Sequence, residues 1–337
     1  ETVGPYEMSQ HVCRRALYFQ ARRTPVQTRR SRRYGHARQS GCESVEVHCA
    51  RVGCAYIVLV RGDQKPVCSH ASHGYPKPVP GLGRRIRDRK QQCPACIIQI
   101  CTAGIIAAER NNGIGIDGVA DKAQIMAIRA VPDGDEYDKD IALGIRYAVD
   151  NGASIINASF GKSFSPNAEW VYEAIKYAAE KDVLIVHAAG NDGLDLDQPS
   201  NPNYPNDQVA AGAEFADNVL TVGSLDSKYG SEVVSSFSNY GTSNVDIFAP
   251  GGQIYSTMPD NEYEFQGGTS MAAPGVAGIA AVIRSRFPKL SASQVKHIIM
   301  DSGLALTPEV VLGGDPEQAR PFARASKSGR IANLYNA

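Results

Sequence analysis

Apolar and polar residues alternate in a regular way from residue 124 to the end of the chain. Short continuous apolar runs of about four to eight residues are typical of buried strands. We expect such strands at residues 124–131, 154–158, 183–188, 219–225 and 245–248.

The segments between these runs place apolar residues at helical spacing. Residues 138–150 have Ile141, Ile145 and Ala148 on one face, and the pattern stops at Gly152. Further helices are expected at residues 103–110, 166–180, 271–286 and 292–300. The second of these carries on one face Trp170, Val171, Ala174, Ile175 and Ala178. Strands that alternate with helices of about 10–15 residues indicate βαβ units. We therefore predict a three-layer α/β sandwich with a mostly parallel sheet.

Residues 1–101 follow no such pattern. Pairs of arginines interrupt every candidate period, and the one convincing strand is 55–60. This segment holds 15 Arg and 3 Lys against 6 acidic residues, whereas the rest of the chain holds 17 basic and 29 acidic residues. The net charge of zero for 337 residues therefore averages two unlike parts. All eight cysteines also lie in the first part, and none follows Cys101.

A serine stands at the start of the expected helix 271–286. It lies in the string Gly267-Gly268-Thr269-Ser270-Met271-Ala272-Ala273-Pro274. A helix N-terminus offers unpaired N–H groups and the positive end of the helix dipole, which suit an attacking oxygen and the oxyanion that it produces. An ordinary capping serine is the alternative. The whole string, however, closely resembles the nucleophile motif of the subtilisin-like serine endopeptidases (subtilases, peptidase family S8), in which Ser270 would be the nucleophile.

Other segments agree with this resemblance, which covers residues 103 to about 306. Ala188-Ala189-Gly190-Asn191-Asp192-Gly193 is similar to the segment of the family in which the amide of Asn191 would donate to the oxyanion. Ser159-Phe160-Gly161 resembles the segment that binds substrate as an added strand. The resemblance implies an S1 pocket between Phe160 with Gly161 and Ala188 with Gly190. With Asp192 at its rim, we expect large P1 side chains and a mild preference for basic ones.

The family's general base and its orienting acid are not recognisable here. Ile98 occupies the position of the catalytic histidine, and an isoleucine accepts no proton. His187 is interpreted as a packed strand residue, and His297 lies in an expected helix. The remaining histidines have no motif spacing; they are His11, His36, His48, His70 and His73. Asp63, about 35 residues before Ile98, is the one candidate acid by position, while Asp301 is interpreted as part of a helix end.

We therefore expect a serine endopeptidase by family that is inactive as written. The alternative is a non-catalytic pseudoprotease that binds peptides in the retained groove. We divide the chain into an aberrant Arg- and Cys-rich segment, 1–102, and the C-terminal part of a subtilisin-like domain, 103–337. The first segment is interpreted as disordered or translated out of frame, a foreign or divergent domain being the alternative. Residues 1–97 are expected to make few contacts with the sheet.

Several partners and locations follow from the same residues. Cys93, Cys96 and Cys101 with Cys68, His70 and His73 look like zinc ligands, but a second C-x-x-C at finger spacing is absent. Nucleic-acid binding is not expected, because no known module houses the arginine pairs. The string around Asn112, residues 110–116, resembles the family's calcium loop and offers part of a site. No membrane span or signal peptide is visible. The resemblance implies protein or peptide substrates and an extracellular or periplasmic location. The sequence leaves the oligomeric state open, and we expect a monomer.

Overall fold

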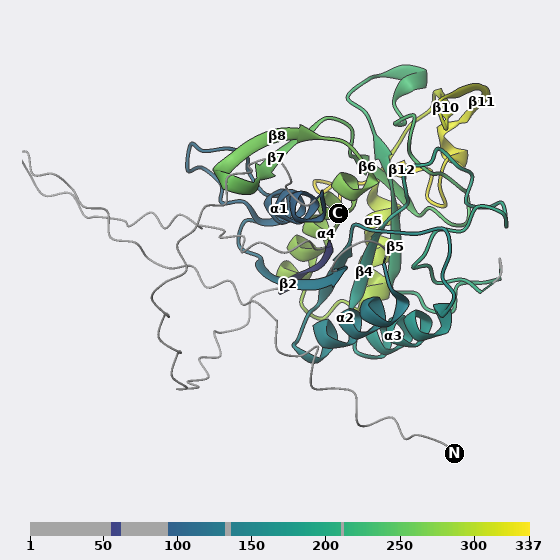
Figure 1. Ribbon diagram of the computed structural model, residues 1–337. Helices are drawn as coiled ribbons and strands as arrows, with labels where there is room; N and C mark the ends of the chain where they lie inside the picture. Colours follow the sequence, from purple (N-terminus) through teal and green to yellow (C-terminus); the bar gives the residue numbers. More distant parts are fainter. Residues whose placement is uncertain (1–54, 62–93, 132–135, 210–211) are drawn as a thin grey trace, which may run out of the picture.

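The computed structural model describes residues 55–61, 94–131, 136–209 and 212–337, and within them eight strands form one sheet. Their order across the sheet is β2-β1-β3-β4-β5-β6-β12-β9 (Figure 1). The strands are β1 (Ala55–Arg61), β2 (Gln124–Val131), β3 (Ile155–Ala158), β4 (Leu184–Ala188), β5 (Val219–Leu225), β6 (Ile247–Pro250), β9 (Leu304–Ala305) and β12 (Arg330–Ile331). Strands β3, β4, β5, β6 and β12 are parallel to one another, so the central part of the sheet is parallel as predicted.

Helices cover both faces of this sheet and complete three layers (Figure 1). On one face, α1 (Pro94–Ala107), α4 (Thr269–Arg286) and α5 (Ala292–Ser302) bury a core against β3 to β6. On the other face, α2 (Asp138–Asp150) and α3 (Ala168–Glu180) pack against β2 to β5. The predicted α/β sandwich is confirmed. No helix in these described ranges is long and apolar enough to cross a membrane.

Some predicted elements differ in detail from the structure. Helix α1 begins at Pro94 rather than at residue 103 and ends at Ala107. Its sequence is apolar on nearly every side, so no stripe marked where it starts. Trp170 does not join the buried face of α3 and is 52% exposed. Two antiparallel hairpins were not predicted: β7 (Ile254–Met258) with β8 (Glu262–Gln266), and β10 (Glu309–Leu312) with β11 (Asp315–Pro321).

Strand β1 corrects one expectation about the N-terminal part. The strand predicted at 55–60 is present, but it lies inside the sheet rather than apart from it. It pairs antiparallel with β2 from Ala55↔Val131 to Arg61↔Gln124, and with β3 at Val58↔Asn157. The expectation of few contacts with the sheet is therefore wrong for β1. Residues 1–54 and 62–93 lie outside the described residues, and so do Asp63, the zinc candidates Cys68, His70, His73 and Cys93, and His11, His36 and His48.

Candidate active site

Ser270 lies in the first turn of α4, at the carboxyl end of the parallel strands. The turn begins after Gly268, whose φ of 150° and ψ of 158° set the chain's entry into the helix. Ser270 Oγ donates to Ser159 O at 3.1 Å, and Ser159 Oγ donates to Ser270 O at 2.8 Å. Asn157 Nδ2 in turn donates to Ser159 Oγ at 2.9 Å. The serine is thereby tied to the end of β3, where the expected substrate-binding strand begins.

Asn191 follows β4 and reaches the same helix turn from the other side. Its Oδ1 accepts from Thr269 N at 2.8 Å and from Thr269 Oγ1 at 3.0 Å. These two bonds orient the amide, and Nδ2 makes no hydrogen bond to any other described residue. The amide N–H groups are therefore available to a ligand beside Ser270.

Ser270 and Asn191 line one cleft of about 600 Å³. The residues predicted to bind substrate lie at this cleft. Ser159 hydrogen-bonds to Ser270 behind its lining. The others line the cleft: Phe160, Gly161, Ala188, Gly190 and Asp192. The floor is Asn203, whose Nδ2 donates to Ala188 O at 3.1 Å and to Ala189 O at 2.9 Å. A Cβ at Gly161 would lie 2.6 Å from Asn203 Oδ1, so an alanine there would force this side-chain amide to move.

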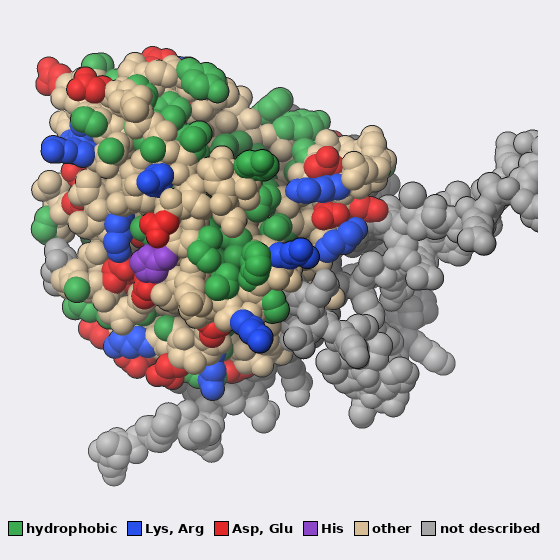
Figure 2. Space-filling model, turned by 180° about the vertical axis from the view of Figure 1, so that it is seen from behind, with side chains coloured by type: hydrophobic (Ala, Val, Ile, Leu, Met, Phe, Trp, Pro, Cys, Tyr) green, Lys and Arg blue, Asp and Glu red, His purple; other side chains and the backbone are tan. Residues whose placement is uncertain are grey.

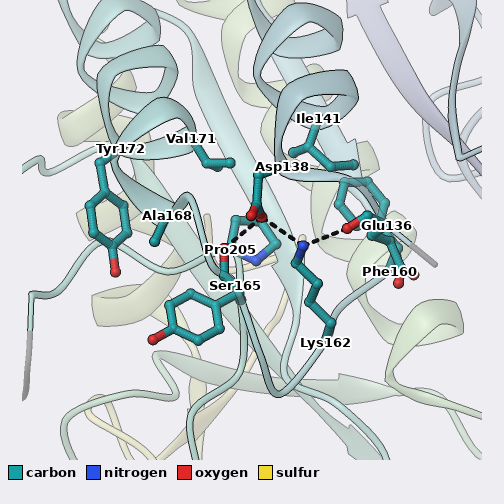
Figure 3. Close-up of a pocket in the computed structure, with 11 residues that line it drawn as sticks. Glu136, Asp138, Ile141, Phe160, Lys162, Ser165, Ala168, Val171, Tyr172 and Pro205 are labelled. Atoms are coloured by element: carbon teal, nitrogen blue, oxygen red, sulfur yellow. Dashed lines mark hydrogen bonds and ion pairs between the residues drawn. The ribbon is translucent and has the colours of Figure 1, made fainter.

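The cleft has a charged neighbour that the sequence did not indicate. Lys162 lines both the cleft and a small adjoining pocket, where its Nζ lies 2.6 Å from Asp138 Oδ1 (Figure 3). Ser165 Oγ and Asn167 N also donate to this carboxylate. Burial alone raises the pKa of Asp138, but these bonds from Lys162, Ser165 and Asn167 outweigh it and hold the pKa below its ordinary value. The charge of Lys162 is thus neutralised, and Asp192 at the rim has no ion-pair partner among the described residues.

An apolar cluster joins α1 and β7 to the first turn of α4, the turn that carries Ser270. Ile98 on α1 packs into a cluster with Cys101, Ile105, Met258 and Met271, the residue after Ser270. Burial raises the pKa of the Cys101 thiol to about 11, so this group stays protonated and is no base. The resemblance gives Ile98 the position of the catalytic histidine, and in the structure Ile98 packs against the cluster that contains Met271.

No histidine of the described residues lines the cleft. His187 is buried in β4, 1% exposed, and its Nε2 donates to Phe160 O at 2.9 Å. Burial lowers its pKa to about 4, so it is a neutral packed residue, as predicted. His297 lies on α5 with its Nε2 3.0 Å from Asp217 Oδ2. Asp301 lies in the last turn of α5 before Gly303, the helix end that the sequence predicted.

The expected calcium loop is only partly built in the described residues. Asn112 Oδ1 accepts from Ile114 N at 2.9 Å, and Asp117 Oδ1 accepts from Asn111 N at 3.2 Å. Calcium takes about six to eight oxygen ligands. Within the described part of the chain no group of three or more His, Cys, Asp or Glu could hold a metal. This loop alone does not complete a calcium site.

Comparison with known proteins gives a consistent result. A model of the subtilase family matches residues 100–324. A thermophilic serine proteinase from Bacillus sp. (strain AK1) is 41% identical over 186 residues, and thermitase from Thermoactinomyces vulgaris is 40% identical over 198 residues. The matched regions cover 55% and 58% of this chain but only 41% and 63% of these relatives, less than two thirds of either.

Solved structures agree with these relatives. A protease from Pseudoalteromonas arctica superposes with a TM-score of 0.56 at 28% identity, covering 70% of this chain and 68% of that one. A cold-adapted subtilisin-like serine proteinase gives a TM-score of 0.51 at 30% identity, covering 61% and 68%.

Proposed function

The chain belongs to the subtilase family of serine peptidases, and from this premise we propose that Ser270 is the nucleophile toward a peptide bond bound in its cleft. A substrate lies as an added strand along Ser159, Phe160 and Gly161. Attack forms a bond between Ser270 Oγ and the carbonyl carbon, and the Asn191 amide donates to the oxyanion that results. Two hydrogen bonds support this most directly. Thr269, the residue before Ser270, donates to Asn191 Oδ1 from its backbone N and from its Oγ1.

We also propose that this chain hydrolyses peptides far more slowly than a relative with a complete catalytic triad. The attacking hydroxyl must give its proton to a base, and Ile98 stands at the position that the resemblance gives to the catalytic histidine. In subtilisin, the standard example of this chemistry, loss of the triad costs about 2 × 10⁶ in kcat and leaves roughly 10³–10⁴ over water. We therefore propose a nearly inactive endopeptidase whose cleft still binds peptides. Ile98 favours the second candidate function, a non-catalytic peptide-binding protein.

Peptide binding and turnover, measured together, test this proposal. We expect extended peptides to bind the chain, while their hydrolysis stays about 10⁶-fold slower than by an intact relative such as thermitase. Gly161→Ala should weaken binding at least about tenfold, because its Cβ would displace the floor residue Asn203. Gly275→Ala on α4 is the matched control, since a Cβ there would meet no described atom within 4 Å. Turnover within tenfold of the relative would show that another base exists. Binding that ignores Gly161→Ala would show that peptides do not use this cleft.

The rim and walls of the cleft support a modest selectivity at P1. Small residues on both walls leave room for a long side chain, and Lys162 is neutralised by Asp138. The exposed carboxylate of Asp192 contributes about 0.2–1 kcal/mol to a basic side chain, a preference of a fewfold. Peptides that differ only in a terminal Lys, Phe or Glu should rank in that order in the same binding assay.

The proposed calcium cofactor and the proposed location rest only on membership of the subtilase family. Asn112 is a partial calcium ligand that would need further oxygens from outside its loop. Secretion to an extracellular or periplasmic location, a monomeric state and the absence of nucleic-acid partners complete the proposal. The separate identity of residues 1–102, as an aberrant or out-of-frame segment, is part of it as well.

A further inference from the structure

We propose that Asn239 is a positioning residue that holds the oxyanion loop, residues 189–194, in the shape that presents the Asn191 amide to the cleft. Asn239 lies in the string Phe237-Ser238-Asn239-Tyr240-Gly241, and the sequence alone assigns no task to its side chain. The inference rests on the proposed function, because it concerns the placement of the proposed oxyanion donor.

The side chain of Asn239 contacts the oxyanion loop on both sides of Asn191. Before Asn191, Asn239 Nδ2 donates to Ala189 O at 2.8 Å. After it, Asn239 Oδ1 accepts from Asp192 N at 3.1 Å and from Leu194 N at 2.9 Å. A side-chain amide has two donor and two acceptor positions, and three of the four are spent on this one loop. Asn239 is 1% exposed, so these bonds form away from competing water.

Backbone contacts add to this hold, and the loop is shaped to receive the amide. Asn239 N donates to Gly190 O at 3.0 Å. Gly190 has a φ of +99°, and a Cβ there would lie 2.4 Å from Asn239 Nδ2. The residue before the oxyanion donor must therefore be glycine, both for its backbone angle and for the room that Asn239 takes.

Asn239 is itself anchored to the sheet. Ser238 Oγ donates to Asn239 O at 2.9 Å and accepts from Ser224 N of β5 at 2.9 Å. Ser224 Oγ also lies 2.9 Å from the hydroxyl of Ser235, and all three serines are buried. Strand β5 neighbours β4, the strand from which the oxyanion loop emerges. The loop is thus fixed relative to the sheet and not only to α4.

Two different residues therefore set the orientation and the position of the Asn191 amide. Thr269 orients the side chain of Asn191, while Asn239 fixes the backbone from which this side chain extends. Catalytic donors act only when held within about 0.5 Å and 10–20° of the productive geometry. Loss of Asn239 should move the donor out of that range, while the opposite wall of the cleft, Phe160 with Gly161, lies outside the loop that Asn239 holds.

Two forms of one peptide measure this effect without any turnover. A peptide that ends in a carboxylate places an anionic oxygen at the oxyanion position, whereas the same peptide with a terminal amide does not. Hydrogen bonds to a charged group suggest that the unaltered chain prefers the acid by about tenfold or more. Asn191→Leu should abolish that preference, measured as the ratio of the affinities for the two peptide forms. Asn239→Ala should do the same, although Asn191 is still present.

The control separates positioning from general stability. Asn218 is also buried, at 2% exposure, and its Nδ2 donates to Val183 O at 2.9 Å, before β5 begins. Asn218→Ala should lower the melting temperature as Asn239→Ala does, yet keep the preference for the acid. If Asn239→Ala does not fold, Asn239→Asp replaces it. That variant keeps both acceptor contacts and loses the donation to Ala189 O, so an intermediate preference is expected.

The outcomes distinguish the two proposals. If the unaltered chain binds both peptide forms equally, the oxyanion role of Asn191 fails, and the inference about Asn239 fails with it. If the unaltered chain prefers the acid and Asn239→Ala or Asn239→Asp keeps the full preference, the proposed function stands and the positioning role of Asn239 is overturned. Loss of the preference in Asn218→Ala as well would also overturn it.

Discussion

Ser270 has neighbours of opposite character on its two sides. Toward β4, the amide of Asn191 and the N-terminal turn of α4 offer hydrogen-bond donors to a developing anion. Toward α1, Met271 belongs to an apolar cluster against which Ile98 packs, and neither of these side chains can take a proton. Stabilising an oxyanion and activating a nucleophile are separate tasks. We propose the first task for Asn191, whereas no histidine of the described residues lines the cleft to perform the second.

A single substitution tests whether the missing base is the main defect. Ile98→His would place an imidazole on α1 at the position that the resemblance gives to the catalytic histidine, next to the cluster that includes Met271. General base catalysis contributes about 10²–10⁴ when the base is well oriented. Without an orienting carboxylate we expect a rise of only about tenfold to a hundredfold in peptide hydrolysis, increasing as the pH passes about 6.5 and the imidazole becomes neutral.

The same substitution in the Ser270→Ala chain is its control. No rise is expected there, because the imidazole would have no hydroxyl to activate. An equal rise with and without Ser270 would mean that the imidazole acts on water alone. No rise in either would mean that Ile98 does not face the nucleophile.

At the residue scale, the motif residues were predictable and their supports were not. Ser270, Asn191 and Phe160 stand in contiguous strings whose chemistry can be recognised locally. Asn203 and Asn239 reach the same cleft from irregular loops, where an asparagine is as typical of a turn as of a clamp. Their roles depend on distances across the fold, such as that from Asn239 to Ala189, which no local spacing encodes.

At the scale of elements, one buried lysine joins three parts of the fold. Lys296 of α5 is 0% exposed, and its Nζ lies 3.0 Å from Glu214 Oε2, 3.6 Å from Asp217 Oδ1, 3.7 Å from Asp246 Oδ1 and 4.0 Å from Asp207 Oδ2. Lys327 also pairs with Glu214. Figure 2, which views the molecule from behind, shows acidic side chains next to a histidine at the surface. Four carboxylates thus share two lysines in a largely buried site.

Because the four carboxylates outnumber the two lysines, the stability of the fold depends on whether Asp207 is protonated. Burial raises the pKa of Asp207 to about 7; Lys296 opposes this rise, whereas Glu214 and Asp246 add to it. The folded state therefore keeps a proton that the unfolded chain releases near pH 4. As the pH rises from about 4 to 7, Asp207 lowers the free energy of unfolding by up to roughly 4 kcal/mol. Asp207→Asn should gain stability relative to the unaltered chain as the pH rises from 5 to 8, measured as the free energy of unfolding by denaturant.

Glu214 provides a comparison of opposite sign within the same cluster. Burial raises its pKa, but Lys327 and Lys296 outweigh burial and hold the pKa below its ordinary value. Its contribution is therefore present at neutral pH and lost as the pH falls through the lowered value. Glu214→Gln should destabilise more at pH 8 than at pH 3. The same pH trend for both variants would contradict this account of the cluster.

The elements themselves differed in how well the sequence indicated them. Helices α2 and α3 are amphipathic, so their apolar stripes marked them. Strands β4 and β5 are buried along their whole length and appear as mainly apolar runs, interrupted by His187 in β4 and by Thr221, Gly223 and Ser224 in β5. Helix α1 is apolar on nearly every side, which hid its start. Strand β8, Glu262–Gln266, alternates acidic or polar with aromatic residues, a two-residue period that indicates a strand and could have been found.

At the scale of the whole molecule, the sheet is continuous only through β1. This strand lies between β2 and β3 and pairs with both. Within the described sheet, β2 has no other neighbouring strand. The sequence indicated a strand at 55–60 but not its place, because pairing between distant segments leaves no local pattern. The distinct charge and cysteine content of residues 1–101 argued against any place in the sheet, and for β1 that argument was wrong.

Two truncations test the place of β1. Removal of residues 1–54 keeps β1 and should leave the melting temperature unchanged within a few degrees. Removal of residues 1–93 also deletes β1, which leaves β2 without a partner and exposes the backbone groups of β3 at an open edge. Such edges promote association with other chains. We expect a melting temperature lower by roughly 10 °C or more, corresponding to a loss of about 3 kcal/mol or more for a domain of this size, together with aggregation on heating. Melting followed by circular dichroism, with light scattering, measures both effects. If the two truncated chains melt at the same temperature and remain monomeric, β1 contributes nothing to the sheet and the strand order β2-β1-β3 is incorrect.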